Sequence, residues 1–157
     1  MATNTALITN LCTTKFAILK WLQMLGYVII VFFLIDGKRQ WAPYTLIFIC
    51  AIIFGILCLA TLLINYFVLQ SRNRNNTTRP KLEIAFNGIA ILFCLVFFAI
   101  LTIDYVKMLS GNYNFHKYLP PPNIGKDGWR NRILVVLITE VLNAILHTLS
   151  LFEGRKI

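Results

Sequence analysis

Residues 44–69 read YTLIFICAIIFGILCLATLLINYFVL, a stretch without a charged residue that is long enough to cross a bilayer as a helix. A hydrocarbon core about 30 Å thick needs about 20 helical residues at a rise of about 1.5 Å each. Comparable apolar stretches are 16–35, 84–103 and 133–152, and the flanks of the third extend its expected span to 82–106. Since backbone amides in lipid must pair within their own segment, we expect an all-α membrane protein, a bundle of four transmembrane helices.

The composition leaves no room for a soluble domain beside these spans. The chain has 157 residues, of which 58% are apolar, so we expect residues 1–157 to form one domain. The first fifteen residues have neither a basic start nor a small-residue cleavage site, and we expect the first span to act as the targeting signal.

The formal net charge of +9 is explained by basic residues at the ends of the spans. We expect their stems to lie along the hydrocarbon edge while their charged groups face anionic headgroups. A nucleic acid is therefore not expected as a partner. The flanking basic residues are Lys15, Lys20, Lys38, Arg39, Arg72, Arg74, Arg79, Lys81, Arg130, Arg132, Arg155 and Lys156.

The density of positive charge predicts the orientation. The compact second connection, 70–81, carries four basic residues in twelve positions, which favours a cytosolic place for this loop and for both termini. The overlapping Asn-x-Thr sequences in Asn75-Asn76-Thr77-Thr78 would need the opposite side for glycosylation. We expect them to be unused, because they lie only a few residues beyond the second span.

Polar residues inside the spans are the candidate functional groups, because polar side chains in hydrocarbon are costly. In the favoured orientation Gln23, Asn65, Asn87 and His147 all lie in the cytosolic half. We expect them to form one hydrogen-bonded layer that holds the helices together.

The fourth span also places Glu140, Asn143 and His147 on one helical face, at spacings i, i+3 and i+7. This face should point inward, with Glu140 either protonated or paired with a donor: the hydroxyl of Tyr27 or Tyr105, or water entering from the outer side. A proton or ion pathway along the same face is the alternative interpretation.

Two acidic residues mark the ends of the third span. Glu83 and Asp104 are expected to be interfacial caps or salt-bridge partners within reach of water, with Lys107 three residues after Asp104. Aromatic residues of the third connection, Tyr113 and Trp129 among them, suit a membrane interface.

Cysteine usage and motifs argue against catalytic, metal or cofactor sites. Cys12 precedes the first span and is a possible palmitoylation site, whereas Cys50, Cys58 and Cys94 lie inside spans, where cysteine acts as a small packing residue. The sequence contains no Cys-x-x-Cys, His-Glu-x-x-His or Gly-x-Ser-x-Gly. We therefore expect no enzyme activity.

Three segments resemble MARVEL-domain proteins. They are the basic, Gln-bearing lead 14-TKFAILKWLQ-23, the opening of the third span 81-KLEIAFNGIA-90 with an acidic residue followed one turn later by Asn, and the basic tail 153-EGRKI-157. The chain looks more similar to the short members of that family, such as plasmolipin, the myelin and lymphocyte protein and the chemokine-like-factor group, than to the junctional members.

The resemblance implies a non-enzymatic role in organising membrane microdomains, in vesicle trafficking or in membrane apposition at junctions. It implies residence in the plasma membrane or trafficking vesicles, with membrane lipids (cholesterol or sphingolipid) and other membrane proteins, or a second copy of the chain, as partners. The alternative, from a different class, is a small channel, transporter or accessory subunit that uses the intramembrane polar face.

Overall fold

The computed structural model describes residues 14–70, 78–118, 120 and 122–154, and within them it contains four helices and no strand. Each helix is long and apolar enough to cross a membrane. The predicted class, an all-α multi-pass membrane protein, is confirmed. The helices are α2 (Lys15–Leu34), α3 (Ala42–Gln70), α4 (Thr78–Leu109) and α5 (Gly125–Gly154).

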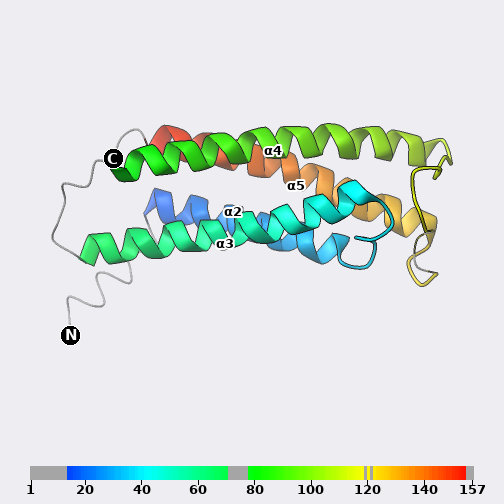
Figure 1. Ribbon diagram of the computed structural model, residues 1–157, viewed down its shortest axis with the longest axis horizontal. Coiled ribbons are helices and arrows are strands. Elements are labelled where there is room, and N and C mark those ends of the chain that lie inside the picture. Colours follow the sequence, from blue (N-terminus) through cyan, green and yellow to red (C-terminus); the bar gives the residue numbers. More distant parts are fainter. Residues whose placement is uncertain (1–13, 71–77, 119, 121, 155–157) are drawn as a thin grey trace.

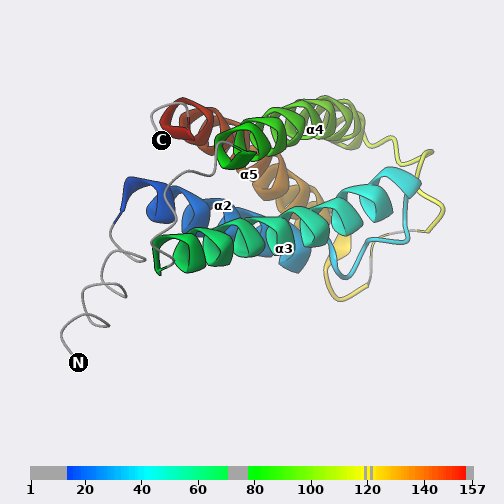
Figure 2. The same ribbon diagram turned by 60° about the vertical axis from the view of Figure 1, so that its left-hand side comes forward.

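Each helix runs antiparallel to the next helix in the sequence (Figures 1 and 2). The pair α2 and α3 and the pair α4 and α5 meet where α2 packs against α5. α5 packs against α2 and α4, α2 packs against α3, and α3 meets α4 only sparsely. The order around the bundle is therefore α3, α2, α5, α4. We call the end where α2 and α4 begin the Lys15 end, and the end where α3 and α5 begin the Gly125 end.

Apolar side chains cover both the interior and the exterior of the bundle. Ile30, Leu34 and Ile47 are fully buried between helices, whereas Phe32 and Leu92 are 68% and 64% exposed. A helix that is apolar on all sides is suited to a lipid environment rather than to water. The exterior of all four helices is thus the surface that faces hydrocarbon.

Local interactions define the start of α2 and the end of α4. Thr14 caps α2, its hydroxyl oxygen accepting a hydrogen bond from the Ala17 amide at 3.3 Å. At the end of α4, the amides of Gly111 and Asn112 bond to the carbonyls of Met108 and Lys107. This is a Schellman motif, and Gly111 supplies the left-handed residue that it requires, at φ +74°.

The fourth helix begins eight residues before the predicted start at Ile133. Trp129, Ile133 and Val136 lie on one face of the helix and are fully buried, so the core-facing stripe continues to the first turns. An Asp127–Arg130 ion pair at 3.1 Å lies on the outer side. The charged residues of these turns lower the mean hydropathy of the segment, which is why a search for apolar runs places the start too late.

Candidate functional site

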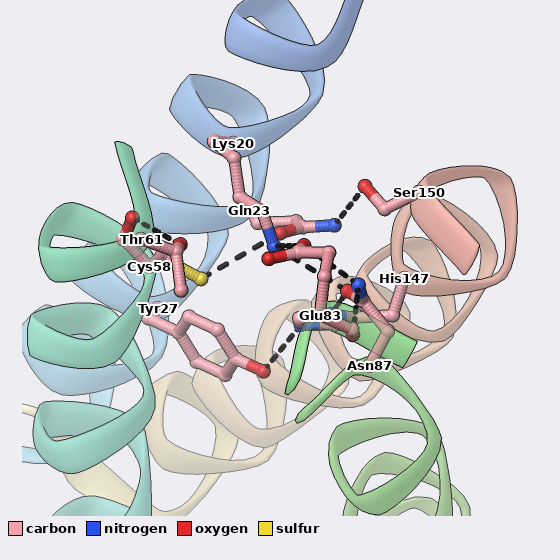
Figure 3. Close-up of polar contacts among 9 residues, drawn as sticks. All are labelled: Lys20, Gln23, Tyr27, Cys58, Thr61, Glu83, Asn87, His147 and Ser150. Atoms are coloured by element: carbon pink, nitrogen blue, oxygen red, sulfur yellow. Dashed lines mark hydrogen bonds and ion pairs between the residues drawn. The ribbon is translucent and has the colours of Figure 1, made fainter. Parts of the chain in front are cut away.

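A network of buried polar groups near the Lys15 end links all four helices (Figure 3). Gln23 on α2 is fully buried, and its side-chain amide nitrogen donates to the Ser150 hydroxyl of α5 at 2.8 Å. The Gln23 carbonyl oxygen accepts from the Cys58 thiol of α3 at 3.6 Å. One amide therefore bridges three helices.

A second chain of hydrogen bonds runs beside the first. The two ring nitrogens of His147 lie 2.8 Å from the Tyr27 hydroxyl and 2.8 Å from Asn87 Oδ1. The Asn87 amide nitrogen donates to both the backbone carbonyl and the carboxylate of Glu83, each at 2.8 Å. Because His147 and Asn87 are fully buried, these bonds hold α2, α4 and α5 together.

Lys20 and Glu83 complete this network as a buried ion pair. The expectation that Lys20 is a headgroup anchor is wrong, because its side chain is 0% exposed and pairs with Glu83. Glu83 is a salt-bridge partner, one of its two predicted roles, but its side chain is only 11% exposed rather than hydrated. The Lys20 ammonium also lies over the Phe86 ring, 4.8 Å from its centre. Pairing across helices satisfies both charges inside the bundle, so neither has to reach the membrane surface.

Three of the four residues predicted for a polar layer lie in this network. Gln23, Asn87 and His147 belong to its two chains, whereas Asn65 is buried on α3 and takes part in none of the hydrogen bonds described above. The network also contains Tyr27 and Ser150, which the sequence analysis did not place in the layer. Hydroxyl groups spaced along the same helix faces as Gln23 and His147 are the signal that would have found them.

Glu140 and Asn143 lie near the middle of the bundle, outside the network. Both are buried, at 2% and 0% exposure. Glu140 Oε2 and both polar side-chain atoms of Asn143 make no hydrogen bond. The Tyr27 hydroxyl, a donor expected for Glu140, is bonded to His147 instead. Asn143 packs on Gly26, where an added Cβ would lie 2.2 Å from Asn143 Oδ1.

A different polar cluster lies at the Gly125 end. The Tyr44 hydroxyl donates to the carboxylate of Asp104, and His116 Nε2 lies 3.1 Å from Asp104 Oδ1. Asp104 pairs with His116, as one of its two predicted roles requires, but its predicted contact with water is wrong, since Asp104 is only 1% exposed. Its predicted partner Lys107 instead lies over the Phe115 ring at 3.5 Å.

Aromatic rings join the first and third connections around this cluster. Trp41 stacks on Phe115 with ring centres 6.0 Å apart, and the Lys117 amide donates to the Gln40 carbonyl at 2.6 Å. Trp129 is fully buried against Tyr44, with ring centres 5.5 Å apart, so its predicted interfacial position is wrong. The indole fills space inside the bundle that an interfacial position would leave empty.

The described residues contain no group of three His, Cys, Asp or Glu side chains that could hold a metal ion. Cys50, Cys58 and Cys94 are free thiols. Cys12 and the Asn-x-Thr acceptors at Asn75 and Asn76 lie outside the described residues, as does the basic tail after Gly154.

Comparison of the chain with family models, with curated proteins and with solved structures finds no match.

Proposed function

We propose that this multi-pass membrane protein acts without catalysis, by organising its surrounding membrane through lateral contacts with lipids and with other membrane helices. Such a role covers microdomain organisation, vesicle trafficking and the support of membrane apposition. It requires a stable bundle whose outer faces are free to make contacts.

One observation carries the proposal: the polar groups at the Lys15 end pair with one another, while large apolar side chains cover the outside. Lys20, Glu83, Asn87 and His147 satisfy their charges and hydrogen bonds internally. Exposed aliphatic and aromatic groups on all four helices supply the contact surface. In lipid, side-by-side helix association depends on packing and on interhelical hydrogen bonds, and these outer faces supply the packing surface.

The resemblance to short MARVEL-domain proteins supports the same role, and with it a place in the plasma membrane or trafficking vesicles. We propose that both termini and the 70–81 connection face the cytosol, because this connection carries the densest positive charge. In that orientation the Lys15 end is cytosolic and the His116 cluster faces the opposite side.

A second candidate function rests on the unpaired polar atoms at mid-depth. Glu140 Oε2 and both polar side-chain atoms of Asn143 are buried without hydrogen-bond partners. His147 lies about two turns after Glu140 on the same helix. A small channel or carrier would use such a face to pass protons or ions. This candidate predicts a flux that depends on Glu140.

One reconstitution measures both functions. The full chain, labelled with donor or acceptor dyes, is placed in lipid vesicles that enclose a pH-sensitive dye. As lipid is added to dilute the labelled chains, energy transfer should stay above the level expected for randomly mixed labels. The proton leak should equal that of empty vesicles. Energy transfer at the random level would contradict self-association. A leak that Glu140→Gln abolishes would favour the channel instead.

A further inference from the structure

A cavity of about 480 Å³ lies between α4 and α5, on the outer side of the bundle. This volume is within the range of about 300–1,000 Å³ that is usual for binding sites. Leu95, Ile145 and Leu149 line the cavity and are each about half exposed, so it opens toward the hydrocarbon. Side chains of a molecule in the membrane can therefore enter it.

Glu140 lines this otherwise apolar cavity, and that is its unusual feature. The residue is 2% exposed, its Oε2 has no hydrogen-bond partner, and its carboxyl group shares a hydrogen bond with the Cys94 thiol. None of the described residues that line the cavity is basic. An acidic group within a span normally pairs with a charged or strongly polar side chain, whereas Glu140 has the weakly polar Cys94 thiol as a partner and leaves its Oε2 unpartnered.

The α5 residues that line the cavity form a strip along that helix. Glu140, Ala144 and Thr148 follow one another at intervals of four residues and so lie along one stripe of α5. Small residues such as Ala144 and Thr148 allow a second backbone to approach closely. From Glu140 to Leu149 the lining extends about 13 Å along the axis, more than two helical turns.

We propose that this cavity docks a transmembrane helix of another protein that carries a lysine or arginine near the middle of its span, and that this basic group pairs with Glu140. The inference rests on the proposed function, since it names the class of partner for one lateral contact. A second copy of this chain does not fit, because the one basic residue within its four apolar runs is Lys20, which lies near the end of its run and is buried against Glu83.

The test uses two transmembrane peptides as probes. One is an oligo-leucine helix of about 20 residues with a single central lysine, and the other is the same helix without the lysine. Each is labelled with an acceptor dye and mixed with donor-labelled full chain in phosphatidylcholine vesicles. We expect the lysine peptide to associate about fivefold to thirtyfold more tightly than the leucine peptide.

Two variants locate the contact. Glu140→Gln keeps the size of the side chain and removes the carboxyl group that can ionise beside a lysine, and it should reduce binding of the lysine peptide to the level of the leucine peptide. Ala144→Phe fills the cavity and should have the same effect. Ala99→Phe is the matched control, because Ala99 is an exposed alanine on α4 that does not line the cavity. It should leave binding unchanged.

Equal binding of the two peptides to the unmodified chain would overturn the inference, as expected if lipid chains alone fill the cavity. Unchanged lysine-peptide binding by Glu140→Gln would also overturn it. Self-association of the full chain, measured in the same vesicles, separates the two proposals. If self-association persists while the two peptides bind equally, the helix-docking inference is wrong and the proposed function stands.

Discussion

Replacing Lys20 by alanine should lower the free energy of unfolding by about 3–5 kcal/mol, the usual cost of leaving one partner of a buried ion pair alone. The loss would leave the Glu83 carboxylate inside the bundle, where its remaining side-chain partner among the described residues is the Asn87 amide. It would also remove the contact between the ammonium and the Phe86 ring. Unfolding by sodium dodecyl sulfate, followed by circular dichroism in mixed micelles, measures the change.

A double variant shows whether the charge pair itself is responsible. Lys20→Met combined with Glu83→Gln removes both charges and keeps an oxygen that can accept from Asn87. Because buried ion pairs are replaceable by uncharged groups of similar volume, we expect the double variant to recover most of the lost stability. A double variant as unstable as Lys20→Ala would show that the pair does not have the role described here.

Gly37→Ala should be destabilising by about 1–3 kcal/mol or more, because the turn between α2 and α3 lies directly against Trp129. An added Cβ at residue 37 would lie 2.0 Å from the six-membered ring of the indole. The ring is fully buried and packed against Tyr44, so it cannot move aside cheaply. The same detergent unfolding assay reports the loss.

A double-mutant cycle isolates this contact. In the background of Trp129→Leu, which removes the ring, Gly37→Ala should cost less than about 0.5 kcal/mol. Gly88→Ala is the control for a change from glycine to alanine, since a Cβ there meets nothing within 4 Å and helix propensity favours alanine by about 1 kcal/mol. An equal loss from Gly37→Ala with and without Trp129 would contradict the contact.

The helices were predictable from sequence because hydropathy alone determines a transmembrane span. The 44–69 stretch lies within α3, and the first span differs from α2 by a single residue at each end. The start of α5 was not predictable in this way. Its first turns bury Trp129 on one face and place charges on the other, and only a search for helical periodicity finds such a segment.

The polar site was predictable in its residue types but not in its pairing. Gln23, Asn87 and His147 stand out because amides and imidazoles inside apolar runs must find partners. Lys20 and Glu83 do not stand out, because each lies near the end of a run, where charged residues normally reach water. Their contact joins α2 to α4, and only the packing of the helices brings the two side chains together.

The pairing of polar residues at the Gly125 end was not predictable from sequence either. His116 belongs to a connection and Asp104 to the end of a span, and nothing in their spacing predicts that both contact Tyr44. The meeting depends on how the connection folds back, through the amide of Lys117 and the ring of Phe115.

The most direct test of the four-span bundle is the reactivity of single cysteines, placed in a variant without native cysteines, toward a maleimide that cannot cross membranes. With the proposed orientation in the plasma membrane, Arg39→Cys and Asn114→Cys should react in sealed cells, and Lys81→Cys should react only after permeabilisation. Val96→Cys and Leu142→Cys, which replace lipid-facing residues near mid-span, should stay unlabelled in both cases. Labelling of Arg39→Cys and Lys81→Cys from the same side, or labelling of the mid-span positions at the rate of the loops, would contradict the bundle.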